Sequence, residues 1–300
     1  MKLKLFTLIL IFTTLLSFYG CQRNSFDPDK IEYKIYSSSS ASLVSNSENQ
    51  EGGEVLQIGD PYEQGLYVNL GSTTFQNPDA PNSKTFVFDQ QCVELPYHSS
   101  KTYRTANGTH ETLKTYSIVD SYVKDSTIME FRHQTGQLIY YNQLNKSIRH
   151  QSGPYTVEDA KNLAIRLLTA LYGEEMLSQY TLKEEPYTDG SSLLHVTYLK
   201  YLHGYPTEDE IRLKFNKKGE LVYLQAECLG YYQHLDEEIS KEQIEYADHL
   251  LRETLPSSYT LHDTSLLVVD ANGKCYIKLF AVHEGVNGSV AGDEYFINVN

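Results

Sequence analysis

Few residues in this sequence have the types and spacing that enzymes use for chemistry. The motifs HExxH, GxSxG, GxxxxGK[ST] and GxGxxG are all absent from the chain. The ten histidines are scattered, and no local spacing offers the three or four convergent ligands of a zinc site. His203 (in HGY) and His283 (in HEG) occupy matching places in an internal repeat, and we expect them to share a structural role before a loop. The sequence therefore predicts no catalytic residue, no metal site and no cofactor.

The acidic residues do not change this expectation. Residues 270–274 (DANGK) start like a calcium loop, but the later acidic ligands and the final glutamate are missing. A hairpin turn accounts for this segment. The runs EDE (208–210) and DEE (236–238) are expected in solvated turns or at helix starts, where negative charge is favourable.

The first twenty residues are typical of a secretory signal peptide. Lys2 and Lys4 supply the charged beginning, residues 5–16 form an apolar run, and small or polar residues follow. A membrane-spanning helix needs about 20 apolar residues, so this run is too short to be a permanent span. We expect residues 1–20 to be removed and the mature protein to lie outside the cytoplasm.

Cys21 is the residue whose position predicts a modification. The sequence Gly20–Cys21 after an apolar run resembles the lipobox of bacterial lipoproteins, in which a small residue precedes the cysteine of the mature N-terminus. Phe18 and Tyr19 depart from that pattern, which has an aliphatic and then a small residue there. The resemblance implies that the Cys21 thiol carries a diacylglycerol, and two or more acyl chains such as palmitate anchor a protein stably. Ordinary signal cleavage beside a chance cysteine remains the alternative.

The charge of the chain limits its partners. Removing residues 1–20 takes away two lysines and no acid, so the formal net charge changes from −14 to −16. Nucleic acids and anionic lipid headgroups need positive patches, so neither is an expected partner. The chain has 25 tyrosines and no tryptophan, and tyrosine is common both in strands and at protein interfaces.

The small number of cysteines indicates few or no disulfide bonds. Besides Cys21 the chain has Cys92, Cys228 and Cys275, and none lies in a CxxC motif. Buried free thiols are the expected state. A Cys228–Cys275 disulfide is the alternative.

The mature chain is expected to contain several parts. Residues 21–54 are rich in serine and would form a lipidated tether, spanning roughly 30 Å as a coil. Within it, the segment KIEYKIY (30–36) has the pattern of a strand. Residues 55–150 read as a β-rich N-terminal region of short strand-like pieces between glycine and proline signals.

The second half of the sequence repeats itself with an offset of 84 residues. Thr156 with Asp159, and Ser240 with Gln243, each open an amphipathic helical pattern with a capping-box arrangement. The strand-like segment DEIRLKFN (209–216) matches DEYFINVN (293–300) at the same offset. A weaker third copy of the hairpin lies at residues 125–141. Each unit is expected to be a helix covering one apolar face of antiparallel strands.

The segment GYPTEDEIRLKFNKKGELVYL (204–224) resembles the PepSY-type modules of bacterial secreted proteins and protease propeptides. Gly204, Pro206, Asn216 and Gly219 fit the loop, strand and turn pattern of that family, whereas the second copy lacks the proline and the return strand. The expected fold is thus α+β, with tandem helix-on-antiparallel-sheet modules at 151–235 and 236–300, the second truncated. The resemblance implies a regulatory role, such as restraining a protease.

Together these features predict a membrane-tethered extracytoplasmic lipoprotein that binds a protein or peptide and is not an enzyme. The alternative is an envelope enzyme, a hydrolase by preference, whose residues converge from distant segments. That alternative predicts a pocket with a perturbed acid or histidine. A purely architectural role would leave neither a pocket nor an apolar patch.

Overall fold

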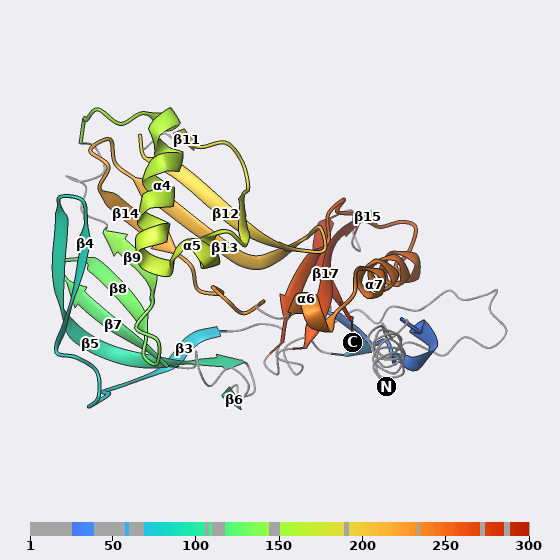
Figure 1. The fold of residues 1–300 in the computed structure, drawn as a ribbon. Coiled ribbons are helices and arrows are strands. Elements are labelled where there is room, and N and C mark those ends of the chain that lie inside the picture. Colours follow the sequence, from blue (N-terminus) through green and yellow to red (C-terminus); the bar gives the residue numbers. More distant parts are fainter. Residues whose placement is uncertain are drawn as a thin grey trace, which may run out of the picture. The chain divides into compact units, whose positions relative to one another are not determined.

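The computed structural model of the 300-residue chain describes residues 26–38, 58–59, 69–105, 108–109, 118–143, 151–188, 192–232, 235–270, 274–284 and 289–299 (Figure 1). The chain divides into two units, Met1–Glu32 and Tyr33–Asn300. In the first unit the described residues form one turn of 3-10 helix, η1 (Pro28–Lys30). The predicted leader at 1–20 and the predicted lipid site at Cys21 lie outside the described residues.

The larger unit contains two hydrophobic cores. The strands around the first core are β3 (Asn69–Phe75), β4 (Ser83–Phe88), β5 (Gln91–Thr105), β6 (Gly108–Thr109), β7 (Ile118–Lys124), β8 (Thr127–Arg132), β9 (Leu138–Gln143), β10 (Tyr180–Leu182), β11 (Tyr187–Thr188), β12 (Leu194–Leu202), β13 (Tyr205–Phe215) and β14 (Leu221–Gln225). They pair antiparallel, and β9 lies beside β14, so the predicted N-terminal β-rich region continues the sheet that follows it. The helices here are α4 (Val157–Tyr172) and α5 (Glu174–Leu177).

The strands around the second core come from both ends of the chain. They are β1 (Ile35–Ser37), β2 (Ile58–Gly59), β15 (Thr260–Leu261), β16 (Leu266–Val269), β17 (Cys275–Glu284) and β18 (Val290–Asn298). The segment predicted as a strand within the tether supplies β1, which pairs antiparallel with β18 and parallel with β2. The helices are α6 (Leu235–Glu238) and α7 (Lys241–Thr254).

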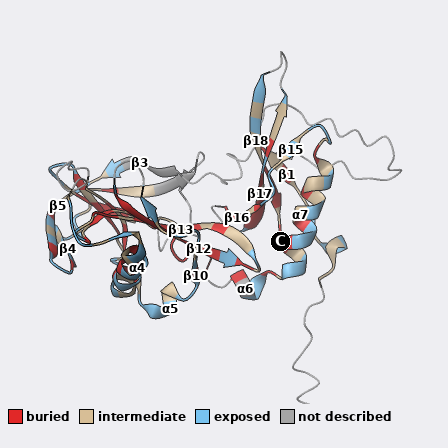
Figure 2. Ribbon diagram, turned by 90° about the horizontal axis from the view of Figure 1, so that it is seen from above, coloured by how far each residue is buried: buried red, intermediate tan, exposed pale blue. Residues whose placement is uncertain are grey.

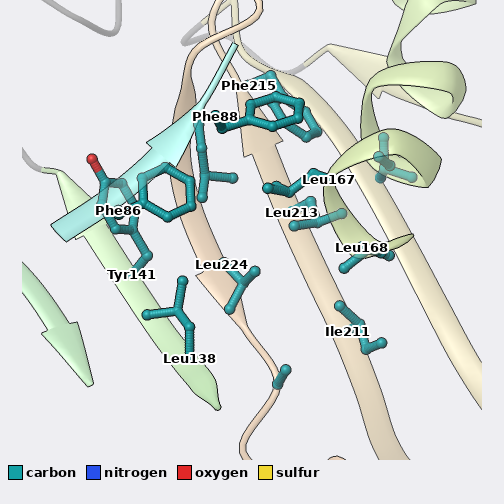
Figure 3. Packing of buried hydrophobic residues seen from close by; sticks show 14 of the residues in the cluster. Phe86, Phe88, Leu138, Tyr141, Leu167, Leu168, Ile211, Leu213, Phe215 and Leu224 are labelled. Carbon is teal, nitrogen blue, oxygen red and sulfur yellow. The ribbon is translucent and has the colours of Figure 1, made fainter. Parts of the chain in front are cut away.

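Local sequence signals account for the two long helices. Both begin one residue after the predicted caps, where the Thr156 amide donates to Asp159 (2.8 Å) and the Ser240 amide donates to Gln243 (2.7 Å). In α4 the buried side chains recur at helical spacing and pack on the sheet, where they meet Ile211, Leu213 and Phe215 of β13 (Figure 3). Figure 2 shows buried residues along the strands and exposed residues on the outer sides of the helices.

The hairpin turn between β13 and β14 also follows from its sequence. Gly219 has φ 81°, which side-chain-bearing residues rarely adopt. A Cβ atom at this position would lie 2.8 Å from the Tyr155 ring, so the close packing of the ring requires glycine as well. The Asn216 side chain accepts hydrogen bonds from the Lys218 and Glu220 amides and closes the turn.

The predicted α+β fold of tandem modules is wrong. The described residues are mostly β, and the eighteen strands are linked in one mixed hydrogen-bonded sheet. The β12–β13 hairpin is the physical reason, because its base lies in the first core whereas its tip residues Leu202 and Tyr205 pack in the second. At Thr207 the hairpin pairs with Leu267 of β16, which joins the strands of the two cores. The two cores are therefore not independent modules.

Candidate functional site

The face of the first sheet that points away from α4 gathers tyrosine and polar side chains. Alternation along the strands sends Leu213 and Leu224 toward α4, so their neighbours point the other way. We call this surface the tyrosine face and define it by six residues of β9, β13 and β14: Tyr140, Asn142, Arg212, Lys214, Tyr223 and Gln225. The pairing of β14 with β9 and β13 brings these residues together.

Two tyrosines form the centre of this face. The rings of Tyr140 and Tyr223 meet edge to face, with their centroids 5.8 Å apart. The Lys214 ammonium lies 5.5 Å from the centroid of the Tyr223 ring, a cation–π distance. Asn142 Nδ2 donates to the Tyr140 hydroxyl (2.9 Å), and the Tyr223 hydroxyl donates to Gln225 (2.8 Å). The face thus combines fixed aromatic rings with half-exposed hydrogen-bonding groups.

Ion pairs border the tyrosine face. Glu210 accepts hydrogen bonds from Arg212 (2.6 Å) and Lys183 (3.0 Å). Burial alone would raise the pKa of Glu210, but these two cations outweigh it and lower that pKa. Among the described residues, Lys214 is the cation of this face without a carboxylate partner. An acidic group on a ligand would therefore find Lys214 available.

A second polar cluster lies at the other end of the first sheet. His133 Nδ1 is 2.7 Å from Asp120 Oδ2, and the Ser100 hydroxyl donates to Asp120 Oδ1. The Tyr97 hydroxyl contacts Ser100 (2.9 Å) and accepts a hydrogen bond from the Asn77 amide (2.8 Å). These residues come from four separate segments, so this cluster is a convergent group of the kind that the enzyme alternative predicts.

The arrangement of this cluster differs from a nucleophile with its base. In a serine hydrolase the hydroxyl donates to the histidine, which the carboxylate orients from its other side. Here the Ser100 hydroxyl donates to the carboxylate itself, so His133 is not placed to activate it. The cluster instead ties the loop at residues 76–82 to the sheet through Asn77 and Tyr97.

The two histidines singled out in the sequence occupy different positions. His203 lies in the β12–β13 turn with φ 50°, and its Nε2 is 2.7 Å from the Ile239 carbonyl oxygen. His283 lies within β17, stacks on Tyr259 and contacts Asp293 at 2.6 Å. Both make structural contacts, but they are not equivalent members of a repeat.

The other residues considered in the sequence are also placed by the structure. Cys228 and Cys275 are free thiols, as is Cys92, which is exposed rather than buried as expected. The residues between Asp270 and Lys274 lie outside the described part, and Lys274 donates its amide to Asp270 (2.9 Å). Among the described residues, no three acidic, histidine or cysteine side chains are grouped to hold a metal ion.

Within the described ranges, no helix has the length and apolar character to cross a membrane. No family model, curated protein or solved structure matches the chain. The tyrosine face and the Asp120–His133 cluster are therefore interpreted from their own geometry.

Proposed function

We propose that this protein is a lipid-anchored extracytoplasmic binding module whose tyrosine face takes an extended peptide segment of a partner protein. The observation that carries the proposal is the Tyr140–Tyr223 pair with its surrounding amide and cationic side chains. Tyrosine supplies apolar area with a polar tip and loses little conformational entropy on binding, which is why it is enriched at interfaces.

The polar groups beside the rings favour a peptide of a particular kind. The amide side chains of Asn142 and Gln225 can hydrogen-bond to peptide groups, which are both donors and acceptors. Lys214 has no carboxylate partner among the described residues, so an acidic residue in the peptide would complete its pairing. The partner segment thus offers peptide groups to the amide side chains and carries at least one acidic residue.

The tyrosine face can be tested with a displayed library of random peptides and, separately, with soluble glycan strands. The chain without its leader should select peptides with an acidic residue, and Tyr223→Ala should weaken their binding at least about tenfold. Lys214→Gln should remove the preference for the acidic residue and reduce the salt dependence of binding.

The control for this experiment is Tyr246→Ala, which removes an exposed tyrosine from α7. Its binding should equal that of the unaltered chain. Equal binding by Tyr223→Ala, or selection of glycan strands in place of peptides, would contradict the proposed function.

The proposed anchor has a separate test in a bacterial host. Cys21→Ser should abolish incorporation of labelled palmitate and move the protein from the membrane fraction to the soluble extracytoplasmic fraction, because the thiol that would carry the lipid is gone. Cys92→Ser is the matched control, since Cys92 is a free and exposed thiol elsewhere in the chain. Unchanged membrane association of Cys21→Ser would exclude the lipoprotein assignment.

A further inference from the structure

A buried polar cluster lies where the β12–β13 hairpin passes from the first core to the second. The register of the hairpin shifts between Leu199, which pairs with Glu210, and Tyr201, which pairs with Pro206. This irregularity leaves Lys200 opposite residues 207–209, and the Thr207 hydroxyl donates to the Lys200 carbonyl oxygen (3.0 Å). We call this place the elbow and define it by Lys200, Thr207 and Asp209.

The elbow holds the segment that connects the two cores. This linker, residues 226–232, follows β14. Gly230 donates its amide to Asp209 Oδ2 (3.0 Å), and Lys200 Nζ donates to the Tyr232 carbonyl oxygen (3.1 Å). Tyr232 then enters the second core, where its hydroxyl donates to the Leu267 carbonyl oxygen (3.0 Å). A change at Asp209 therefore acts directly on the connection between the cores.

Arg132 holds the beginning of the same linker. Its guanidinium donates to the Glu227 carbonyl oxygen (3.0 Å) and lies over the Tyr231 ring. Asp209, Lys200 and Arg132 are 0%, 4% and 1% exposed. Three buried ionisable side chains from three strands thus bind backbone groups of one short segment.

Among the described residues, hydrogen-bond donors reach only one of the two carboxylate oxygens of Asp209. Its Oδ2 accepts hydrogen bonds from Tyr180 (2.6 Å) and Gly230, whereas Oδ1 has no hydrogen-bond donor among the described residues. The titratable and charged groups that face it are Tyr180 of β10, Tyr172 of α4, Arg132 of β8, Lys200 of β12, Cys228 of the linker and the neighbouring Glu208.

Burial decides the protonation of Asp209. Loss of hydration raises its pKa from 3.8 to about 6, despite the opposing hydrogen bonds from Tyr180 and Gly230 and the nearby charges of Lys200 and Arg132. If the elbow opens, hydration returns the carboxyl to its ordinary pKa. Between pH 4 and pH 6 the closed elbow therefore binds one more proton than the open elbow, and rising pH favours opening.

We propose that the elbow is a pH-dependent latch between the two cores, held closed when Asp209 carries its proton and loosened when Asp209 is ionised. A shift of one pKa unit corresponds to a factor of ten, so the opening equilibrium should increase about 100-fold from pH 4 to pH 7. Acidification of the surroundings would tighten the connection between the cores. This inference does not depend on the proposed peptide binding.

Hydrogen exchange of linker peptides, corrected for the intrinsic pH dependence of exchange, tests the latch. In the chain without its leader, protection of residues 226–232 should fall about 100-fold between pH 4 and pH 7. In Asp209→Asn this added pH dependence should disappear, because the side chain no longer titrates. The exposed Asp79→Asn substitution is the control and should leave the profile unchanged.

Tyr180→Phe provides a test that does not remove the carboxyl group. The Tyr180 hydrogen bond lowers the pKa of Asp209, so its loss should raise that pKa. The fall in protection of residues 226–232 should then extend to higher pH. A purely structural role for Tyr180 would lower protection at every pH without moving the transition. Identical pH profiles for the unaltered chain and Asp209→Asn would overturn the latch, as would an unmoved transition in Tyr180→Phe.

Discussion

Replacing Ile35 by aspartate is expected to destabilise the second core by more than about 4 kcal/mol. Ile35 is 1% exposed, lies among the side chains of the second core and pairs with Ile297 across β1 and β18. The substitution would remove a large apolar side chain and bury a carboxylate without a partner. Hydrogen exchange should show lost protection in α7, β17 and β18, and chemical denaturation should give the change in stability.

The conservative substitution Ile35→Val is the control for this experiment. It retains the apolar strand residue and should cost only about 0.5–1.5 kcal/mol. A stability of Ile35→Asp within about 1 kcal/mol of the unaltered chain would show that β1 is dispensable to the second core. The predicted tether would then have no structural role.

The large effect expected at Ile35 arises from the place of β1 in the sheet. In the first core β14 lies antiparallel beside β13, with Leu224 opposite Leu213. In the second core β1 lies antiparallel beside β18, with Ile35 opposite Ile297, and Ile297 is 84 residues after Leu213. A strand from the N-terminal segment thus lies beside β18 as β14 lies beside β13. Under the proposed lipid anchor, only residues 22–34 separate Cys21 from this strand.

Local features could be predicted from the sequence because local interactions determine them. The capping boxes of α4 and α7, the turn at Asn216 and Gly219 and the hairpin at residues 125–141 each depend on residues within a few positions of one another. The predicted fold class was wrong because the fold depends on two long-range contacts. These are the pairing of β1 with β18 and the packing of the β12–β13 hairpin tip in the second core. The periodicity of residues within one segment does not indicate either of these contacts.

The tyrosine face was missed for a related reason. Alternation in LIYYNQ (Leu138–Gln143) and LVYLQ (Leu221–Gln225) indicates strands, yet it does not say which strands are neighbours. Only the pairing of β14 with β9 places Tyr223 beside Tyr140. The enrichment in tyrosine was the available signal, and it indicated an interface without locating it.

The interpretation of the run EDE as a solvated turn was wrong at Asp209. A run of three acidic residues usually lies in solvent, but Asp209 belongs to the buried face of β13, together with Thr207 and Ile211, and is completely buried. Its neighbour Glu210 keeps contact with solvent and two cations. The difference between adjacent acids follows from the alternation of side chains along β13, which places them on opposite faces.

Leu202→Ala should destabilise the second core although the residue belongs to the hairpin of the first. Leu202 is fully buried and belongs to the second core, which also includes residues of α7 and β17. Truncating it should leave a cavity and cost about 2–5 kcal/mol. Hydrogen exchange in α7 and β17 should accelerate accordingly, while α4, which packs at the base of the hairpin, should change less.

Tyr201→Ala is the matched control for Leu202→Ala, because Tyr201 is the preceding residue of the same strand and is 41% exposed. It should cost less than about 1 kcal/mol, as surface substitutions commonly do. Independent tandem modules would give the opposite result, with Leu202→Ala lowering protection in α4 and leaving α7 unaffected. In Leu202→Ala, the loss of protection in α7 relative to the loss in α4 therefore measures how strongly the β12–β13 hairpin couples the two cores.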